Sequence, residues 1–173
     1  MWSGPVLANS STGDHFFDGG GHGMIDRLKE GLSFEWRAER HTELLLADLA
    51  ETATAPDLSG RLTELAAAAQ ARRSRLERRL MALSARPRLA PLPPILDRLD
   101  RALEIALAQT RASADRYAAL AELSRRLADP ETAFACELNR TGAEESAILL
   151  DGLLALEVDR SALRPGAESS LGL

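Results

Sequence analysis

The sequence has few of the residues that build β-sheets. Valine and isoleucine together supply six of the 173 residues, and aromatic side chains make up only 4%. Strands are enriched in β-branched and aromatic residues, so a sheet-based fold is nearly excluded. Alanine and leucine instead account for 61 residues, and both are among the strongest helix formers. The composition therefore predicts an all-α protein.

Cysteine and lysine are also scarce. The single cysteine, Cys136, excludes an internal disulfide and a cysteine-based zinc site, and its apolar neighbours indicate a small buried side chain. One lysine and 20 arginines stand against 26 acidic residues, which gives a net charge of −5. A mildly acidic chain lacks the basic surface of a nucleic-acid-binding protein. We therefore expect no nucleic acid among its partners.

Long apolar runs are missing as well. The first residues show neither the basic start nor the apolar stretch of a secretory signal. The longest apolar run near the C-terminus is interrupted by Asp151 and Glu157 and falls short of the roughly 20 residues that a membrane span needs. We expect a cytoplasmic, bacterial protein without a membrane span, and the arginine bias reflects a GC-rich genome.

Glycine and proline mark the predicted limits of the folded part. Residues 1–23 hold six of the twelve glycines and are predicted to form a flexible arm, in which the run at 19–23 should not hold a helix. The arm also carries Trp2, Phe16 and Phe17, so docking onto the bundle or onto a neighbour stays open beside plain disorder. Residues 158–173 are predicted to form a second tail. The domain between them covers 24–157.

Four long helices are predicted within that domain. Their expected ranges are 24–51, 56–83, 95–127 and 130–158, with Thr54 and Asp57 at capping-box spacing and Asp129 as the N-cap of the last helix. The connector 84–94 carries four of the eight prolines. Extended, it reaches roughly 34 Å, whereas a 27-residue helix is about 40 Å long. The pattern predicts a four-helix bundle with a long crossover that leaves the second and third helices parallel.

Each helix has a stripe of apolar residues whose middle is polar or small. The stripe of the last helix is Phe134, Leu138, Thr141, Glu145, Ile148, Gly152 and Leu156. If the stripes face inward, polar groups meet at the bundle centre, where metal sites of helical bundles are built. The predicted central network consists of Glu35, Glu39, Arg72, Arg73, Gln109 and Glu145. Helix phases shifted by one position would instead place these side chains on the surface.

The helix order and two local segments are similar to the ferritin-like superfamily, in particular to rubrerythrin-type and YciE/YciF-type bundles. The segments are E-W-R-A-E-R-H-T-E at 35–43 and T-G-A-E-E-S-A-I-L-L at 141–150. The resemblance implies a metal site with a Glu from the first and third helices and a Glu-x-x-His from the second and fourth. Glu35 or Glu39 matches the first position. The second helix has no histidine, and Ala147 or Ile148 stands at the histidine position of the fourth.

Two hypotheses for the bundle centre follow. Because a buried carboxylate needs a partner, Arg72 or Arg73 could pair with Glu35 or Glu39 and form a network without catalytic residues or a cofactor. The alternative is a metal-binding protein with iron or manganese in an atypical carboxylate site. That site would use Glu35, Glu39, Glu104 and Glu145.

Two surfaces are candidates for partner binding. Trp36 lies off the main stripe of the first helix and should form an exposed apolar flank with Leu44 and Leu45, as protein interfaces do. Arg72, Arg75 and Arg79 share one helix face, which could bind an acidic partner. The leading prediction is a non-catalytic bundle that acts as an assembly or interaction subunit, as a homo-oligomer or within a larger complex. An adaptor that binds through the arginine face is the remaining alternative.

Overall fold

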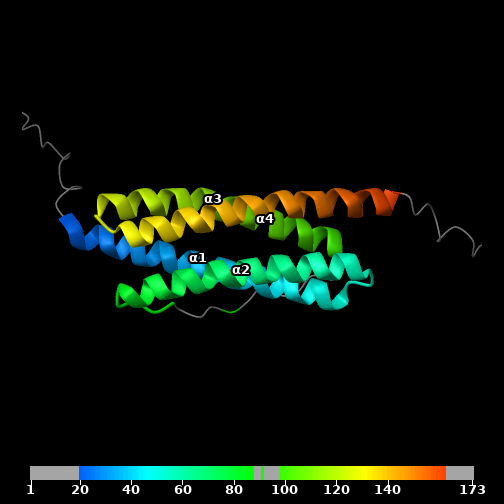
Figure 1. The fold of residues 1–173 in the computed structure, drawn as a ribbon, viewed down its shortest axis with the longest axis horizontal. Helices are drawn as coiled ribbons and strands as arrows, with labels where there is room; N and C mark the ends of the chain where they lie inside the picture. The colour runs from blue at the N-terminus through cyan, green and yellow to red at the C-terminus, as the bar shows by residue number, and fades with distance from the viewer. Residues whose placement is uncertain (1–19, 88–90, 92–97, 163–173) are drawn as a thin grey trace, which may run out of the picture.

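The computed structural model describes residues 20–87, 91 and 98–162, which form four helices (Figure 1). The helices are α1 (Gly20–Thr52), α2 (Pro56–Ala82), α3 (Leu99–Arg126) and α4 (Pro130–Ala162). The described part contains no strand. This confirms the all-α prediction drawn from the alanine and leucine content.

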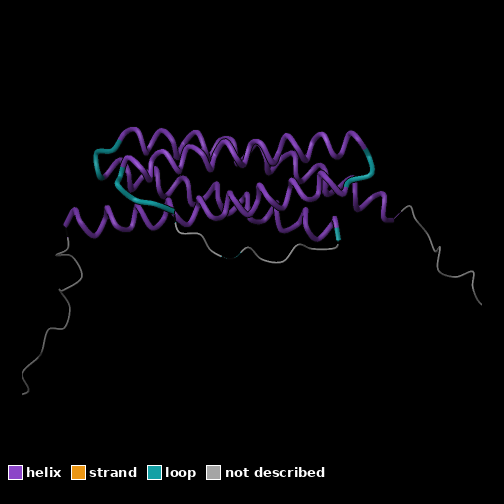
Figure 2. Tube along the Cα trace, turned by 90° about the horizontal axis from the view of Figure 1, so that it is seen from below, coloured by secondary structure: helices purple, strands orange, loops and turns teal. Residues whose placement is uncertain are grey.

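The helices form an elongated bundle in which α1 packs along α2 and α3 packs along α4. These two pairs meet through α1 with α3 and through α2 with α4. The turns within the pairs lie at opposite ends of the bundle (Figure 2). As a result α2 and α3 run in the same direction (Figure 1), which confirms the predicted crossover.

Local chemistry explains where the helices begin and end. Asp129 caps α4 as predicted, because its Oδ1 accepts a hydrogen bond from the backbone N–H of Thr132 at 3.0 Å. The predicted capping box at the start of α2 is wrong: Ala55 holds the N-cap position without a side-chain hydrogen bond, and Pro56 follows it. Proline suits the first helical turn, since that N–H would be unpaired in any case.

Two helix limits differ from the sequence prediction. α1 begins at Gly20, so the expectation that residues 19–23 hold no helix is wrong for 20–23, because extending a formed helix costs far less than nucleating one. α4 continues to Ala162, beyond the predicted end of the domain at 157. Residues 1–19, which carry the aromatics of the predicted arm, and residues 163–173 lie outside the described residues, as does the predicted start of the third helix.

The core consists of two apolar clusters, one toward each end of the bundle. One contains leucines of all four helices, among them Leu46, Leu62, Leu103 and Leu150. The other is built around Leu32, Leu76, Tyr117 and Cys136. The polar residues Glu39, Arg72 and Ser146 are buried between them. The predicted division into apolar ends and a polar middle is therefore present.

The inner face of α4 differs from its prediction. The predicted stripe of this helix, from Phe134 to Leu156, faces solvent: Phe134 is 70% exposed and Ile148 is 72% exposed. Mostly small residues face inward instead, namely Thr132, Ala133, Cys136, Asn139, Ala143, Ser146, Ala147, Leu150 and Leu153. Because α4 has apolar residues on all sides, periodicity alone did not identify its buried face. Among the described residues, none of the helices combines the length and apolarity that crossing a membrane requires.

Candidate functional site

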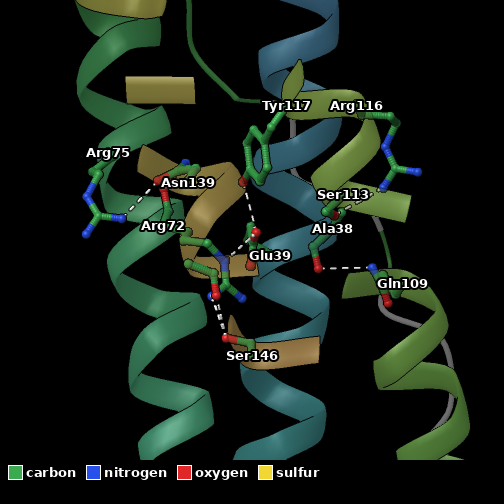
Figure 3. Close-up of polar contacts among 11 residues, drawn as sticks. Ala38, Glu39, Arg72, Arg75, Gln109, Ser113, Arg116, Tyr117, Asn139 and Ser146 are labelled. Atoms are coloured by element: carbon green, nitrogen blue, oxygen red, sulfur yellow. Dashed lines mark hydrogen bonds and ion pairs between the residues drawn. The ribbon is translucent and has the colours of Figure 1, made fainter. Parts of the chain in front are cut away.

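A buried ion pair between α1 and α2 lies at the centre of the bundle (Figure 3). The Nε of Arg72 donates to Oε1 of Glu39 at 2.8 Å, and each side chain is only 2% exposed. The choice between Arg72 and Arg73 is thereby made, since only Arg72 points into the bundle. Each charge compensates the other, which a buried ion requires.

The other two helices complete this pair. From α3, the hydroxyl of Tyr117 donates to the same Oε1 of Glu39 at 2.9 Å. From α4, the Oγ of Ser146 and the carbonyl oxygen of Gly142 accept hydrogen bonds from Nη1 of Arg72 at 2.9 and 3.1 Å. Burial, together with the charges of Glu39 and Glu35, raises the pKa of Tyr117 well above its ordinary value, so its hydroxyl keeps its proton and remains a donor.

Asn139 fixes the backbone of α2 beside the pair. Its Nδ2 donates to the carbonyl oxygen of Arg72 at 3.1 Å, and its Oδ1 accepts from Nη1 of Arg75 at 2.9 Å. Asn139 is fully buried, and these contacts use both ends of its amide. All four helices thus contribute to one hydrogen-bonded network around Glu39 and Arg72, which we call the central network.

Glu35 lies one turn earlier on α1 and has a different environment. It is fully buried, and its Oε1 accepts from Nε of Arg116, whose side chain is 37% exposed. Its Oε2 has no hydrogen-bond partner within the described residues. Burial raises the pKa of Glu35 above its ordinary value, because the loss of hydration outweighs the attraction of the Arg116 guanidinium.

Three residues predicted for the centre lie elsewhere. Arg73 is partly exposed and pairs with Glu43 at 2.7 Å, because it follows Arg72 by one position and points about 100° away from it. Gln109 lies at the edge of the bundle, where its Nε2 donates to the carbonyl oxygen of Ala38 and its Oε1 contacts His41. Glu145 is exposed, because it lies on the stripe of α4 that faces solvent.

The four carboxylates of the predicted atypical metal site do not converge. Glu104 is on the surface and pairs with Arg101 at 2.9 Å, and Glu145 is exposed as well. Within the described residues, no group of three or more His, Cys, Asp or Glu side chains could hold a metal ion. This alternative ligand set is therefore wrong.

The residues at the bundle centre do not fit a site that binds two metal ions. Such sites in helical bundles use about four carboxylates and two histidines. Here Glu39 already accepts from Arg72 and Tyr117, and a permanently charged guanidinium occupies the space beside it. A cation placed there would be repelled by Arg72 and would compete with it for Glu39.

The predicted flank of Trp36, Leu44 and Leu45 is not an exposed patch. Trp36 and Leu45 are each 5% exposed, and only Leu44 reaches the surface. The guanidinium groups of Arg40 and Arg73 lie 5.9 and 5.7 Å from the Trp36 ring. A helix in a bundle faces two neighbours, so its buried arc is wider than one stripe, which explains why residues beside the stripe are covered.

The arginine face of α2 is also used within the bundle. Arg72 is buried, Arg75 donates to Asn139, and Arg79 pairs with Asp129 and Glu131 of the start of α4. The prediction that this face is free to bind an acidic partner is therefore wrong. Its arginines instead join α2 to α4.

Several members of the central network were missed by the sequence analysis. Asn139, Gly142 and Ser146 lie on the face of α4 that was expected to be outside, and Arg116 was not considered. A row of small residues from Ala133 through Cys136 and Ala143 to Ala147 was the available signal, since small side chains let helices approach closely. Tyr117, in contrast, reaches Glu39 from the expected inner side of α3. Cys136 is buried, which raises its pKa to about 12.

Known structures share this fold. The protein XCC3681 of Xanthomonas campestris is 22% identical over 82% of this chain and 97% of its own, with a TM-score of 0.73. A "ferritin like, diiron-carboxylate" protein of Bacillus anthracis is 20% identical over 76% and 97%, with a TM-score of 0.69. The "dodecameric thioferritin" of Bacteroides fragilis is 20% identical over 83% and 91%, with a TM-score of 0.63. The chain matches no protein-family model, and the comparison with curated proteins found no match.

These similarities establish the class of fold. The chain has the four-helix fold of ferritin-like proteins, and the predicted fold is thereby confirmed. The narrower likeness to rubrerythrin-type and YciE/YciF-type bundles stays a prediction. The site within the fold is the central network described above.

Proposed function

We propose that this chain is a non-catalytic ferritin-like bundle that serves as an assembly or protein-interaction subunit and forms a homo-oligomer. The observation that carries the proposal is the position of Arg72, whose guanidinium contacts Glu39 at 2.8 Å in the bundle centre. In bundles with two metal ions, the metal charge compensates the buried carboxylates. Here the positive charge of Arg72 compensates Glu39 instead. Such a centre holds the four helices together and leaves no open coordination position for a substrate.

Two further observations support the role in assembly. The Bacteroides fragilis neighbour is described as dodecameric, so the fold supports assemblies of many copies. The chain also exposes large apolar side chains on α4, which usually mark an interface in a helical protein. We propose a bacterial, cytoplasmic protein. Its partners are proposed to be proteins and not nucleic acids, because Arg72, Arg75 and Arg79 of α2 are used within the bundle.

Measuring the metal content of purified full-length protein tests this proposal. Cells would be grown with added iron, manganese and zinc, and the protein analysed by mass spectrometry for these elements. We expect less than about one tenth of an equivalent of each metal per chain. A stoichiometric amount of one metal that disappears in Glu39→Gln would overturn the proposal.

Glu35 supports a second candidate function, a metal-binding bundle with a single weak site. Its Oε2 is buried and has no partner among the described residues, and a carboxylate oxygen is a suitable ligand for iron or manganese. The Bacillus anthracis neighbour is described as a diiron-carboxylate protein. Metal that is retained in wild type, lost in Glu35→Gln and unaffected in Glu104→Gln would favour this candidate over the first.

A further inference from the structure

The outer face of α4 is the main apolar surface of the described part. Six of the nine large hydrophobic side chains that this part exposes belong to α4, namely Phe134, Leu138, Ile148, Leu149, Leu156 and Val158. Five of the six, all but Val158, lie within one arc of the helix, on the side opposite Cys136 and Ala143. A helix that has apolar residues on two opposite faces usually packs against other protein surfaces on both faces.

We infer that this face binds the same face of a second copy of the chain, with the two α4 helices antiparallel and crossing near residue 143. This inference deepens the proposed assembly function, on which it rests, by naming the partner and the surface. The face, which we call the α4 stripe, consists of Phe134, Leu138, Thr141, Glu145, Ile148 and Gly152. All six are exposed.

The α4 stripe is chemically self-complementary in this arrangement. Antiparallel pairing about residue 143 places Leu138 opposite Ile148 of the second copy, which joins two apolar side chains. The bulky Phe134 lies opposite Gly152, where a Cβ would meet nothing within 4 Å, so the second copy offers space for the ring.

The two polar positions of the α4 stripe also match each other. Thr141 lies opposite Glu145 of the second copy, so that a neutral side chain, whose hydroxyl donates to the carbonyl oxygen of Glu137 in its own helix, faces the carboxylate. A parallel pairing would instead place Glu145 against Glu145 and Phe134 against Phe134. The antiparallel direction thus avoids a contact between like charges, which destabilises helix pairs.

The charges that flank the α4 stripe do not oppose this contact. Glu137 pairs with Arg125 and Arg140 at 2.6 and 2.9 Å, Glu144 pairs with Arg140 at 2.8 Å, and Asp151 pairs with Arg111 at 3.0 Å. Their negative charges are compensated within each copy. Two such faces can therefore approach each other without strong repulsion.

A groove beside the α4 stripe extends the contact surface toward α2. Its lining includes Leu65, Ala68 and Ala71 of α2 and Leu138, Gly142 and Leu149 of α4, together with charged side chains such as Glu64 and Arg75. The small residues among them leave room for side chains of a second helix. From Phe134 to Leu156 the helix is about 33 Å long, so the contact follows most of the bundle.

The first test is the mass of the full-length protein in sedimentation equilibrium. We expect wild type to contain at least two copies and Ile148→Asp to fall to half that mass or less, with unchanged helicity, because Ile148 is 72% exposed and its loss leaves the core intact. Met81→Asp is the matched control, since Met81 is 67% exposed at the end of α2, and should keep the wild-type mass.

The outcomes separate the two proposals. A monomeric wild type would overturn both the inference and the proposed assembly role. An oligomer whose mass is unchanged in Ile148→Asp would overturn only the inference about α4.

Disulfide cross-linking tests the antiparallel direction. Leu138→Cys and Ile148→Cys would be made separately in a Cys136→Ala background, given distinguishable tags and mixed under mild oxidation. We expect the mixed disulfide to exceed either symmetric disulfide at least fivefold, and Met81→Cys to give none with either. Symmetric disulfides that predominate would contradict the antiparallel arrangement.

Discussion

At the two ends of the bundle, leucine and alanine fill the space between the helices, whereas at its centre a glutamate, an arginine and a tyrosine do. The ends gain stability from burying apolar surface, which depends little on which partner is present. The centre depends on pairing, because Glu39 and Arg72 are each unfavourable in the core without the other. Truncating one buried side chain should therefore change the free energy of unfolding differently at the centre and at the ends.

The largest effect is expected from breaking the central pair. Arg72→Met leaves the buried Glu39 without its counter-charge, which should lower the free energy of unfolding by about 3–5 kcal/mol. Urea unfolding would measure the loss. The double variant Glu39→Leu, Arg72→Met should recover much of it, since both charges are then absent. Arg73→Met is the control, because its partly exposed pair with Glu43 is worth about 0–1 kcal/mol. Equal losses at 72 and 73 would show that the central pair has no special role.

A smaller and simpler effect is expected at the ends. Leu76→Ala and Leu62→Ala each remove a fully buried side chain and should lower the free energy of unfolding by about 2–5 kcal/mol. The loss should be the same at pH 5 and pH 8, because no titratable partner is left behind. Thermal melts at the two pH values would measure it, and a clear pH dependence would mean that the ends and the centre are coupled.

A further prediction concerns the buried carboxylate of Glu35, which should lower the stability of the protein when it is ionised. Its pKa is raised in the folded protein from an ordinary value of 4.5, so the folded state binds its proton more tightly than the unfolded state. This contribution to stability is fully present below pH 4.5 and is lost as the pH rises through the folded pKa. Glu35→Gln should therefore raise the melting temperature at pH 7 and change it little at pH 4. A variant less stable than wild type at pH 7 would contradict this reasoning.

The smallest effect concerns the turn between α3 and α4. Ala128 has a φ of 54°, a left-handed conformation that glycine adopts without steric cost. Ala128→Gly should raise the free energy of unfolding by about 1 kcal/mol, measured by urea unfolding. Ala119→Gly, at an exposed position within α3, should lower it by a similar amount, and a loss at both positions would contradict the assignment.

The sequence predicted the fold and much of the inner faces of α1, α2 and α3, because their apolar residues recur at helical spacing on one side; Trp36 and Leu45, which lie beside that stripe, were misplaced. Glu35, Glu39 and Arg72 were placed correctly in the interior on that basis. The same reasoning failed for α4, whose larger apolar side chains face outward while alanines and serines face inward. Pairing details such as the choice between Arg72 and Arg73 could not be predicted either, since a rotation of one residue position decides them.

The most direct test of the central claim, that Arg72 takes the place of a metal, is a thermal melt with added metal. Wild type and Glu39→Gln would be heated with Fe²⁺, Mn²⁺ or Zn²⁺ at concentrations up to about 1 mM, because a ligand that binds only the folded state raises its stability. The account predicts that none of the three metals raises the melting temperature of wild type beyond its effect on Glu39→Gln. A saturable increase in wild type that is absent from Glu39→Gln would contradict it.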